Sequence, residues 1–418
     1  MNLTCSFAHT RIRPEYHQTS CFGGTYIVLT SSDSRKTLHI NPYRNGQSQK
    51  DENQTKHLLT LLFPLLFLLS HSTGAAPVGV CYGRVANNLP LPSAVISLLN
   101  SNRISRIRLF NPDRDSLAPF SGTGIELMIG VPNEILPMLA NGTVATSQQW
   151  LKSNIFTYVT PNQVRYLVVG NEVLLKEPYY TPYVVPAILN LYQALQALGL
   201  GDTIKVSSSH AATILSDSYP PSDGAFDPNL KSILIPLLGF LRDTRSPLMV
   251  NVYPFYSYIN NKEKATLDYA LFRSSKIEVD QNLPYTNMFD ATIDAFVYAM
   301  EREGFHGIPV VVTETGWPKG GADGTSVDNA LAYNGNIVMR ALANIGTPKR
   351  PGVGIESSYL IYLMRMRKVE ENMRGILGFL GLMVQTAKEN ERRPRTSPNS
   401  KPRTSSGLEA WDIPRLVP

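Results

Sequence analysis

Two glutamates stand at the ends of strongly apolar runs in this chain of 418 residues. Glu172 closes VRYLVVGNE, and Glu314 closes PVVVTE. A carboxylate at the end of a buried strand has little structural reason to be there. Paired carboxylates suit glycoside hydrolysis, in which one protonates the leaving oxygen while the other attacks the anomeric carbon. A solvated loop position is a competing interpretation for either glutamate alone, and a weaker one for both together.

Side chains near the same strand ends are suited to holding a sugar. Asn171, next to the first glutamate, could hydrogen-bond a sugar 2-hydroxyl, a contact that strengthens in the transition state. Aromatic rings could stack on sugar faces, although each ring singly is more often part of a core. The aromatic candidates are Tyr82, Tyr253, Phe255, Tyr256 and Trp317.

The elements that would position these residues alternate regularly. Helix-like stretches such as YVVPAILNLYQALQAL and TIDAFVYAMEREGF separate short β-branched runs. Alternating strands and helices indicate a parallel sheet, and eight such units favour a closed (β/α)8 barrel, a TIM barrel of the α/β class, over an open sheet. The two glutamates then follow the fourth and seventh strands, on the face where such barrels place their active sites. The predicted strands are 77–82, 104–110, 125–131, 164–170, 204–208, 248–253, 309–313 and 355–363.

Composition argues against several other functions. Residues 1–57 carry seven basic and four acidic side chains, and residues 386–418 carry the same numbers, which leaves 25 of each sign between them. The net charge of +6 therefore belongs to the ends, and a neutral body argues against a nucleic-acid partner. Beyond residue 72 the chain has only two histidines and one cysteine, Cys81, so neither a histidine-rich zinc site nor a disulfide framework is expected. No phosphate-binding glycine motif follows a strand, and we expect no metal or organic cofactor.

The segments that flank the predicted barrel at 77–385 differ from it in composition. Residues 58–76 contain the apolar run LLTLLFPLLFLLS followed by small residues, which is typical of a secretory signal peptide, with a buried core helix as the alternative. Because a signal peptide should start at the N-terminus, residues 1–57 are interpreted as an N-terminal extension that is either disordered or absent from the mature protein. The Pro/Ser/Arg-rich segment 386–418 predicts a disordered tail.

Two further motifs carry less weight. Asn141 begins an Asn-Gly-Thr acceptor for N-glycosylation, provided that the chain is secreted. The run SSSH that ends at His210 could suggest a Ser/His hydrolase, but no GxSxG elbow accompanies it. We therefore interpret that run as cleft wall or packing.

Four runs, PVGVCYGRVANNLP, YLVVGNEV, VNVYPFYSY and VVVTETGWP, occur in this order. In this combination the chain resembles the plant glucan endo-1,3-β-glucosidases of glycoside hydrolase family 17, over about residues 77–357. The resemblance implies a secreted (β/α)8 enzyme that hydrolyses internal β-1,3-glucosidic bonds with retention. It assigns the general acid/base to Glu172 and the nucleophile to Glu314. The positions that match residues of the family's cleft are Tyr82, Asn171 and Tyr253.

The resemblance breaks down after the eighth predicted strand, where the chain reads YLIYLMRMRKVEENMRGILGFLG. Arg365 and Met366 stand about where the family has an Asn/Asp-Glu pair, while Lys368 and Glu371 match its later Lys and Glu. A cation near the mouth favours the ionised form of nearby carboxyl groups and would impair a proton donor. An Arg365 that points into solvent would have no such effect, and the sequence leaves both possibilities open.

The sequence thus predicts a secreted hydrolase of β-1,3-glucans such as callose or fungal-wall glucan. We expect it in the extracellular space or cell wall, without stable insertion into a membrane, and as a monomer, because a single barrel needs no partner to complete its core. A wall protein that binds β-glucan but scarcely hydrolyses it is the alternative that the altered segment suggests. A transglycosylase that uses the same two glutamates is a third possibility.

Overall fold

The computed structural model describes residues 21–22, 25–28, 39–42, 78–83, 91–102 and 104–360. The chain divides into two units, Met1–Ser72 and Thr73–Pro418. The predicted signal segment and the predicted tail lie outside the described residues. None of the helices within the described ranges is long and apolar enough to cross a membrane. In the first unit the described residues form an antiparallel sheet of β1 (Cys21–Phe22), β2 (Thr25–Val28) and β3 (His39–Pro42).

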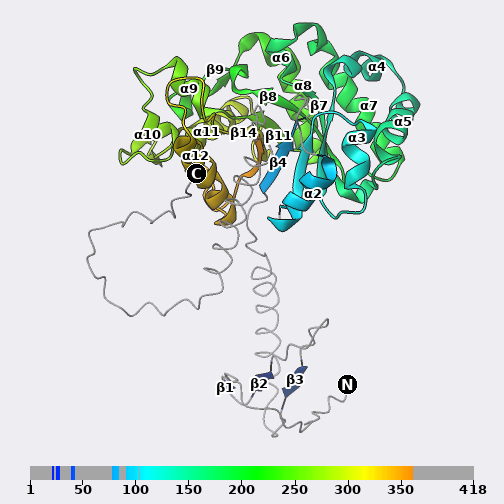
Figure 1. Ribbon diagram of the computed structural model, residues 1–418, viewed down its shortest axis with the longest axis horizontal. Coiled ribbons are helices and arrows are strands. Elements are labelled where there is room, and N and C mark those ends of the chain that lie inside the picture. The colour runs from blue at the N-terminus through cyan, green and yellow to red at the C-terminus, as the bar shows by residue number, and fades with distance from the viewer. Residues whose placement is uncertain are drawn as a thin grey trace, which may run out of the picture. The chain divides into compact units, whose positions relative to one another are not determined.

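Eight parallel strands of the second unit close into a barrel, as the alternating pattern predicts (Figure 1). Neighbouring strands follow the order β11-β14-β15-β4-β5-β6-β7-β8, and β8 pairs again with β11. All eight predicted strands are present, and Glu172 directly follows the fourth while Glu314 lies on the seventh. The strands are β4 (Val78–Tyr82), β5 (Arg106–Leu109), β6 (Glu126–Val131), β7 (Val164–Asn171), β8 (Lys205–Ala211), β11 (Leu248–Asn251), β14 (Val310–Thr315) and β15 (Glu356–Leu360).

Helices connect the strands and surround the barrel (Figure 1). The helix predicted from TIDAFVYAMEREGF begins earlier, at Met288, because the Asn287 side chain accepts a hydrogen bond from the Asp290 amide at 2.8 Å and caps it. The longer helices are α2 (Pro92–Ser101), α7 (Val184–Ala197), α8 (Lys231–Thr244), α11 (Met288–Arg302) and α12 (Val327–Leu342). The shorter ones are α3 (Arg114–Leu117), α4 (Leu136–Asn141), α5 (Val144–Leu151), α6 (Val173–Lys176), α9 (Pro254–Asn260) and α10 (Leu267–Ala270).

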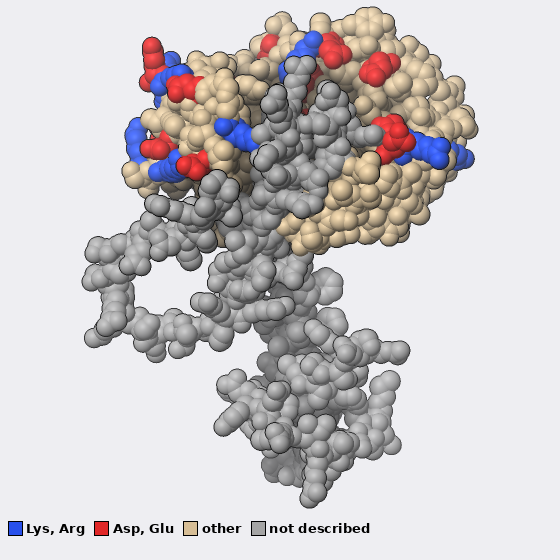
Figure 2. All heavy atoms as spheres, in the orientation of Figure 1, with Lys and Arg blue, Asp and Glu red and all other residues tan. Residues whose placement is uncertain are grey.

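Short elements fill the connections. Two antiparallel pairs lie outside the barrel, β9 (Leu215–Asp217) with β10 (Ala225–Phe226) and β12 (Glu278–Asp280) with β13 (Leu283–Tyr285). The short helical segments are η1 (Ala118–Phe120), η2 (Asn133–Ile135), η3 (Lys152–Phe156), η4 (Pro161–Gln163), η5 (Pro178–Tyr183), η6 (Ala212–Ile214), η7 (Pro221–Asp223) and η8 (Pro228–Leu230). On the face that Figure 2 shows, charged side chains of both signs lie interspersed.

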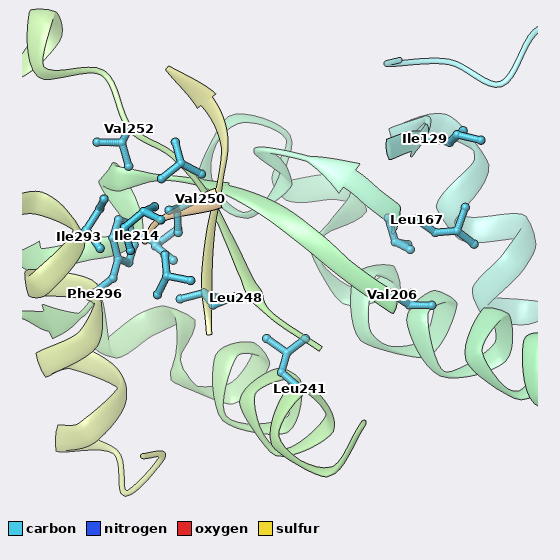
Figure 3. Close-up of a cluster of buried hydrophobic side chains, with 14 of the residues drawn as sticks. Ile129, Leu167, Val206, Ile214, Leu241, Leu248, Val250, Val252, Ile293 and Phe296 are labelled. Atoms are coloured by element: carbon cyan, nitrogen blue, oxygen red, sulfur yellow. The ribbon is translucent and has the colours of Figure 1, made fainter. Parts of the chain in front are cut away.

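Strand parity divides the apolar side chains into two clusters. Outward-facing residues such as Leu167, Val206 and Leu248 pack under the helices in one large cluster (Figure 3). The inward-facing residues form a separate, smaller cluster inside the barrel. Its members are Met128, Tyr166, Val168, Met249 and Val311. The barrel interior is therefore a packed apolar layer rather than a pore.

A polar network lies at the amino ends of the strands, beneath that layer. Arg106 forms ion pairs with Glu126 at 2.6 Å and with Glu356 at 2.9 Å. The hydroxyl of Tyr166 donates to Glu356 at 3.0 Å, and burial raises the pKa of Tyr166 to about 12. These contacts join β15 to β5 and β7 across the barrel, which stabilises the closed arrangement.

Candidate active site

Four neighbouring strands bring polar side chains to the carboxyl end of the barrel. In the order β7-β8-β11-β14, Asn171 pairs in register with Ser209 and Asn251 pairs with Glu314. Shifts of register interrupt these ladders just before the paired residues, as is common beside active sites. Glu172 follows Asn171 directly. Both predicted glutamates therefore lie at the same end of the barrel.

Glu314 is held at both carboxylate oxygens. Its Oε1 accepts a hydrogen bond from Arg108 Nη1 at 2.8 Å, and its Oε2 accepts one from the Tyr253 hydroxyl at 2.8 Å. The residue is only 7% exposed. A charged guanidinium and a hydroxyl group thus donate to one oxygen each, and together they fix the orientation of this nearly buried carboxylate.

Arg108 is the cation at the centre of this arrangement. Its side chain is 1% exposed. Side chains alternate between the two faces of β5, and because Ile107 and Leu109 face the helices, Arg108 points into the barrel. Besides Glu314, its guanidinium donates to the Thr313 carbonyl at 3.0 Å and to Asn171 Oδ1 at 2.8 Å. It also lies 4.6 Å from the ring centroid of Phe110. A buried charge of this kind needs such partners to offset its desolvation.

Glu172 has an unusual backbone conformation for a residue with a side chain. Its φ is 52°, in the left-handed region, and its amide donates to the Ser209 carbonyl at 2.8 Å. The preceding Gly170 has φ 76°, and a Cβ there would lie 2.7 Å from Val173 Cγ2. The chain therefore turns sharply from β7 into α6 at Glu172. Strained backbone held by its surroundings is characteristic of functional sites.

The side chain of Glu172 is also held at both oxygens. Asn251 Nδ2 donates to Oε1 at 2.8 Å, and the Lys176 ammonium, one helical turn further along, pairs with Oε2. Asn251 is oriented in turn, because its Oδ1 accepts from Ser209 Oγ at 2.8 Å and from Thr313 Oγ1 at 2.7 Å. Arg108 Nη1 also donates to Asn251 Oδ1 at 3.5 Å, so Arg108 and Asn251 connect the contacts of Glu314 to those of Glu172.

A cavity of about 320 Å³, a volume suited to a small ligand, opens beside Glu172 and Arg108, and Glu314 is not among its lining residues. Its lining combines acidic and basic side chains with the ring of Phe110 and the backbone of Gly130 and Gly170. Asn133 lines it and fixes the backbone of Asn171, whose amide donates to Asn133 Oδ1 at 2.8 Å. The remaining lining residues are Arg108, Asn111, Val131, Pro132, Glu134, Val168, Asn171, Glu172, Lys176 and Glu177.

The aromatic residues that the sequence suggested have different exposures. Tyr82, Phe255 and Trp317 are buried, whereas Tyr256 is 50% exposed. The indole of Trp317 donates to the Gly324 carbonyl at 3.0 Å, and its ring lies 5.2 Å from that of Phe255. The burial of Trp317 and Phe255 supports a role behind the cleft wall, while Tyr256 offers a ring to solvent.

His210 does not pair with the neighbouring serine. Ser209 Oγ contacts Asn251 and Thr313, and neither ring nitrogen of His210 has a hydrogen-bond partner among the described residues. Burial lowers the pKa of His210 to about 4, so the ring is neutral near pH 7. It faces a second, very small cavity with Leu174 and other residues of α6 and η6. This agrees with the interpretation of packing rather than nucleophilic catalysis.

Several other residues singled out in the sequence fall elsewhere. The Cys81 thiol is buried, donates to the Thr313 carbonyl at 3.3 Å, and has a pKa raised by that burial. Asn141 is exposed at the end of α4. The candidates after the eighth strand lie outside the described residues: Arg365, Met366, Lys368 and Glu371.

Sequence reasoning missed three residues of the site: Arg108, Asn251 and Lys176. A signal for Arg108 was available, because an arginine at an inward-facing position of an apolar strand needs a buried acidic partner. Asn251 lies inside the run VNVYPFYSY and at a strand end, the same kind of position that indicates Asn171. Lys176 could have been found from its spacing, since residues four apart meet on a helix.

Comparisons with known protein families and structures find matches over the barrel. The family model for Glycosyl hydrolases family 17 matches residues 78–372. A probable glucan endo-1,3-beta-glucosidase of Arabidopsis thaliana is 41% identical over 321 residues, which is 76% of this chain and 90% of that protein. The basic vacuolar isoform of glucan endo-1,3-beta-glucosidase from Nicotiana tabacum is 38% identical over 311 residues, covering 73% of this chain and 83% of that protein.

Two solved structures are similar as well. A beta-1,3-glucanase and allergen of Cryptomeria japonica pollen is 42% identical, with a TM-score of 0.66 over 68% of this chain and 89% of that chain. A plant beta-glucan endohydrolase is 40% identical, with a TM-score of 0.62 over 68% of this chain and 90% of that chain.

Proposed function

Because the chain belongs to glycosyl hydrolases family 17 and is a glycoside hydrolase of the endo-1,3-β-glucanase type, we propose that Glu172 and Glu314 cleave internal β-1,3-glucosidic bonds with retention. One observation carries the proposal: two nearly buried carboxylates at the ends of the fourth and seventh barrel strands share a network through Arg108 and Asn251. Paired carboxylates on one face are the groups that a retaining glycosidase needs.

In this mechanism Glu314 is the nucleophile. Arg108 and Tyr253 bind one carboxylate oxygen each, so they align the carboxylate and offset the cost of burying its charge. Attack on the anomeric carbon gives a covalent glycosyl-enzyme, which water then hydrolyses.

Glu172 is the general acid in the first step and the general base in the second. Asn251 fixes its Oε1, while Oε2 pairs with Lys176, a side chain that is 65% exposed. Because an exposed lysine moves easily, substrate can take its place at Oε2. Once the Lys176 ammonium has left, the Glu172 carboxyl can take up a proton from solvent, and Oε2 then gives that proton to the leaving oxygen.

The other predicted contacts belong to the same proposal. Arg108 fixes Oδ1 of Asn171 and so presents its Nδ2 to a sugar 2-hydroxyl. Tyr256 stacks on a sugar face, and Tyr82, Phe255 and Trp317 shape the cleft wall. Lys368 and Glu371 bind substrate from the segment after the eighth strand.

We further propose that the protein is a secreted monomer of the cell wall, glycosylated at Asn141. Exposure of Asn141 at the end of α4 supports the last point. A vacuolar relative exists in Nicotiana tabacum, so cell fractionation is the appropriate measurement of location.

Reducing-sugar release from a linear β-1,3-glucan tests the catalytic roles. Glu314→Gln should reduce release to background, and Glu172→Gln should reduce it by at least about 100-fold. With an aryl β-glucoside whose leaving group needs no proton, Glu172→Gln should still form the glycosyl-enzyme, whereas Glu314→Gln should not. Only the assigned roles predict this difference between the variants.

Glu301→Gln is the matched control, because this glutamate pairs with Lys349 and lies outside the site. NMR of the first product should show the β-anomer. Retained activity in Glu314→Gln, or an initial α-anomer, would refute the proposed mechanism.

A further inference from the structure

An exposed tyrosine cluster lies just beyond Glu172 in the chain. Tyr179 in η5 is 70% exposed, although large rings are usually covered. Its centroid lies 5.0 Å from that of Tyr180 and 6.1 Å from that of Tyr183. Tyr180 and Tyr183 in turn pack against the main apolar cluster. Tyr179 is therefore an exposed ring with rigid support from behind.

The backbone beneath Tyr179 is restricted. Pro178 begins η5 and Pro182 lies within it, and each proline ring fixes φ. The Tyr180 amide donates to the Glu177 carbonyl at 2.9 Å. A ring on such a support loses little conformational entropy when a ligand binds to it.

The cluster directly follows, in the chain, a segment that lines the cavity beside Glu172. α6 begins immediately after Glu172, and Lys176 and Glu177 line the cavity. The hydroxyl of Thr181 contacts the Leu174 carbonyl at 3.4 Å, which ties η5 to α6. A glucan chain that leaves the cavity past Lys176 and Glu177 would therefore reach η5.

The roles of the two glutamates determine which part of the glucan lies near η5. Glu314 attacks the sugar that becomes attached to the enzyme, and Glu172 protonates the oxygen of the sugar that leaves. The strands β8 and β11 separate the two glutamates, so the region beyond Glu172 is remote from Glu314. Groups in that region face the leaving portion of the glucan.

We infer that Tyr179 is a binding platform for glucosyl residues on the leaving-group side of the scissile bond. This inference rests on the proposed function, since it takes the two glutamate roles from there. An aromatic face binds the C–H face of a β-linked glucose through apolar contact.

The test compares two substrates with the full-length protein. One is a β-1,3-linked glucose hexamer labelled at its reducing end, and the other is an aryl β-1,3-glucoside that carries no sugar on the leaving-group side. Tyr179→Ala should lower kcat/KM for the hexamer by about 3- to 10-fold and leave that for the aryl glucoside unchanged. Its cleavage of the hexamer should shift toward the reducing end, because binding modes that place several sugars beyond the scissile bond lose the platform.

Tyr179→Phe keeps the ring and should behave as wild type, and Val353→Ala alters an exposed residue just before β15 as a second control. An unchanged cleavage pattern in Tyr179→Ala, or an equal loss on both substrates, would overturn the platform while leaving the glutamate roles intact. A wild-type protein inactive on both substrates would overturn the proposed function and this inference together.

Discussion

Replacing Arg108 by methionine should destabilise the fold and abolish activity together. Methionine has a side chain of similar length, but it lacks the N–H groups that donate to Glu314, the Thr313 carbonyl and Asn171. Removing one partner of a buried ion pair costs about 3–5 kcal/mol, and the two neutral acceptors are part of that cost. Because Arg108 is 1% exposed, solvent does not screen the loss. For a domain of this size we expect the melting temperature to fall by about 10 °C.

A double-mutant cycle with Glu314→Gln identifies the source of this cost. If the uncompensated carboxylate dominates, Arg108→Met should cost about 2 kcal/mol less in the Glu314→Gln background than in wild type. Denaturant unfolding of the four proteins measures the difference, and Arg108→Lys shows whether charge alone suffices. Additive costs would refute the view that Arg108 stabilises the structure mainly through Glu314.

Two further predictions concern Tyr253 and His210. Tyr253→Phe removes the hydroxyl that donates to Glu314 and should lower kcat/KM by about 10- to 100-fold with little change in unfolding free energy, whereas equal activity would exclude a role for that hydrogen bond. Burial lowers the pKa of His210 from 6.5 to about 4, so between these pH values the unfolded chain binds a proton at this histidine that the folded protein does not. The free energy of unfolding is therefore unaffected by His210 above pH 6.5. It falls by up to about 3 kcal/mol as the pH is lowered toward 4. His210→Leu should therefore flatten unfolding free energy between pH 4 and 6.5, and an unchanged slope would contradict this account.

The barrel could be predicted from the sequence because its signals are local. Runs such as VRYLVVG have β-branched residues bounded by loops, and the helical stretches between them have the period of a surface helix. Glu172 and Glu314 were identifiable for a related reason. A carboxylate directly after a buried run contrasts with its neighbours, and the barrel topology fixes which end of the strand it occupies.

The network around the glutamates could not be predicted in the same way. The contact of Arg108 with Glu314 joins positions 206 residues apart in the chain, and it depends on inward parity and on irregular register between β11 and β14. The sequence also does not predict how exposed each aromatic side chain is. Trp317 and Tyr256 both follow strands, yet Trp317 is buried against Phe255 and Tyr256 is half exposed. Such differences arise from loop packing, which hydrophobic periodicity does not encode.

The apolar layer inside the barrel limits the routes by which water and substrate reach the two glutamates. Met128, Val168, Met249 and Val311 separate the ion pairs of Arg106 from Arg108 and Glu314 above them. Within the described part of the barrel, water and protons therefore reach the two glutamates from one end only. Substrate, departing product and the hydrolytic water therefore all use that same end of the barrel.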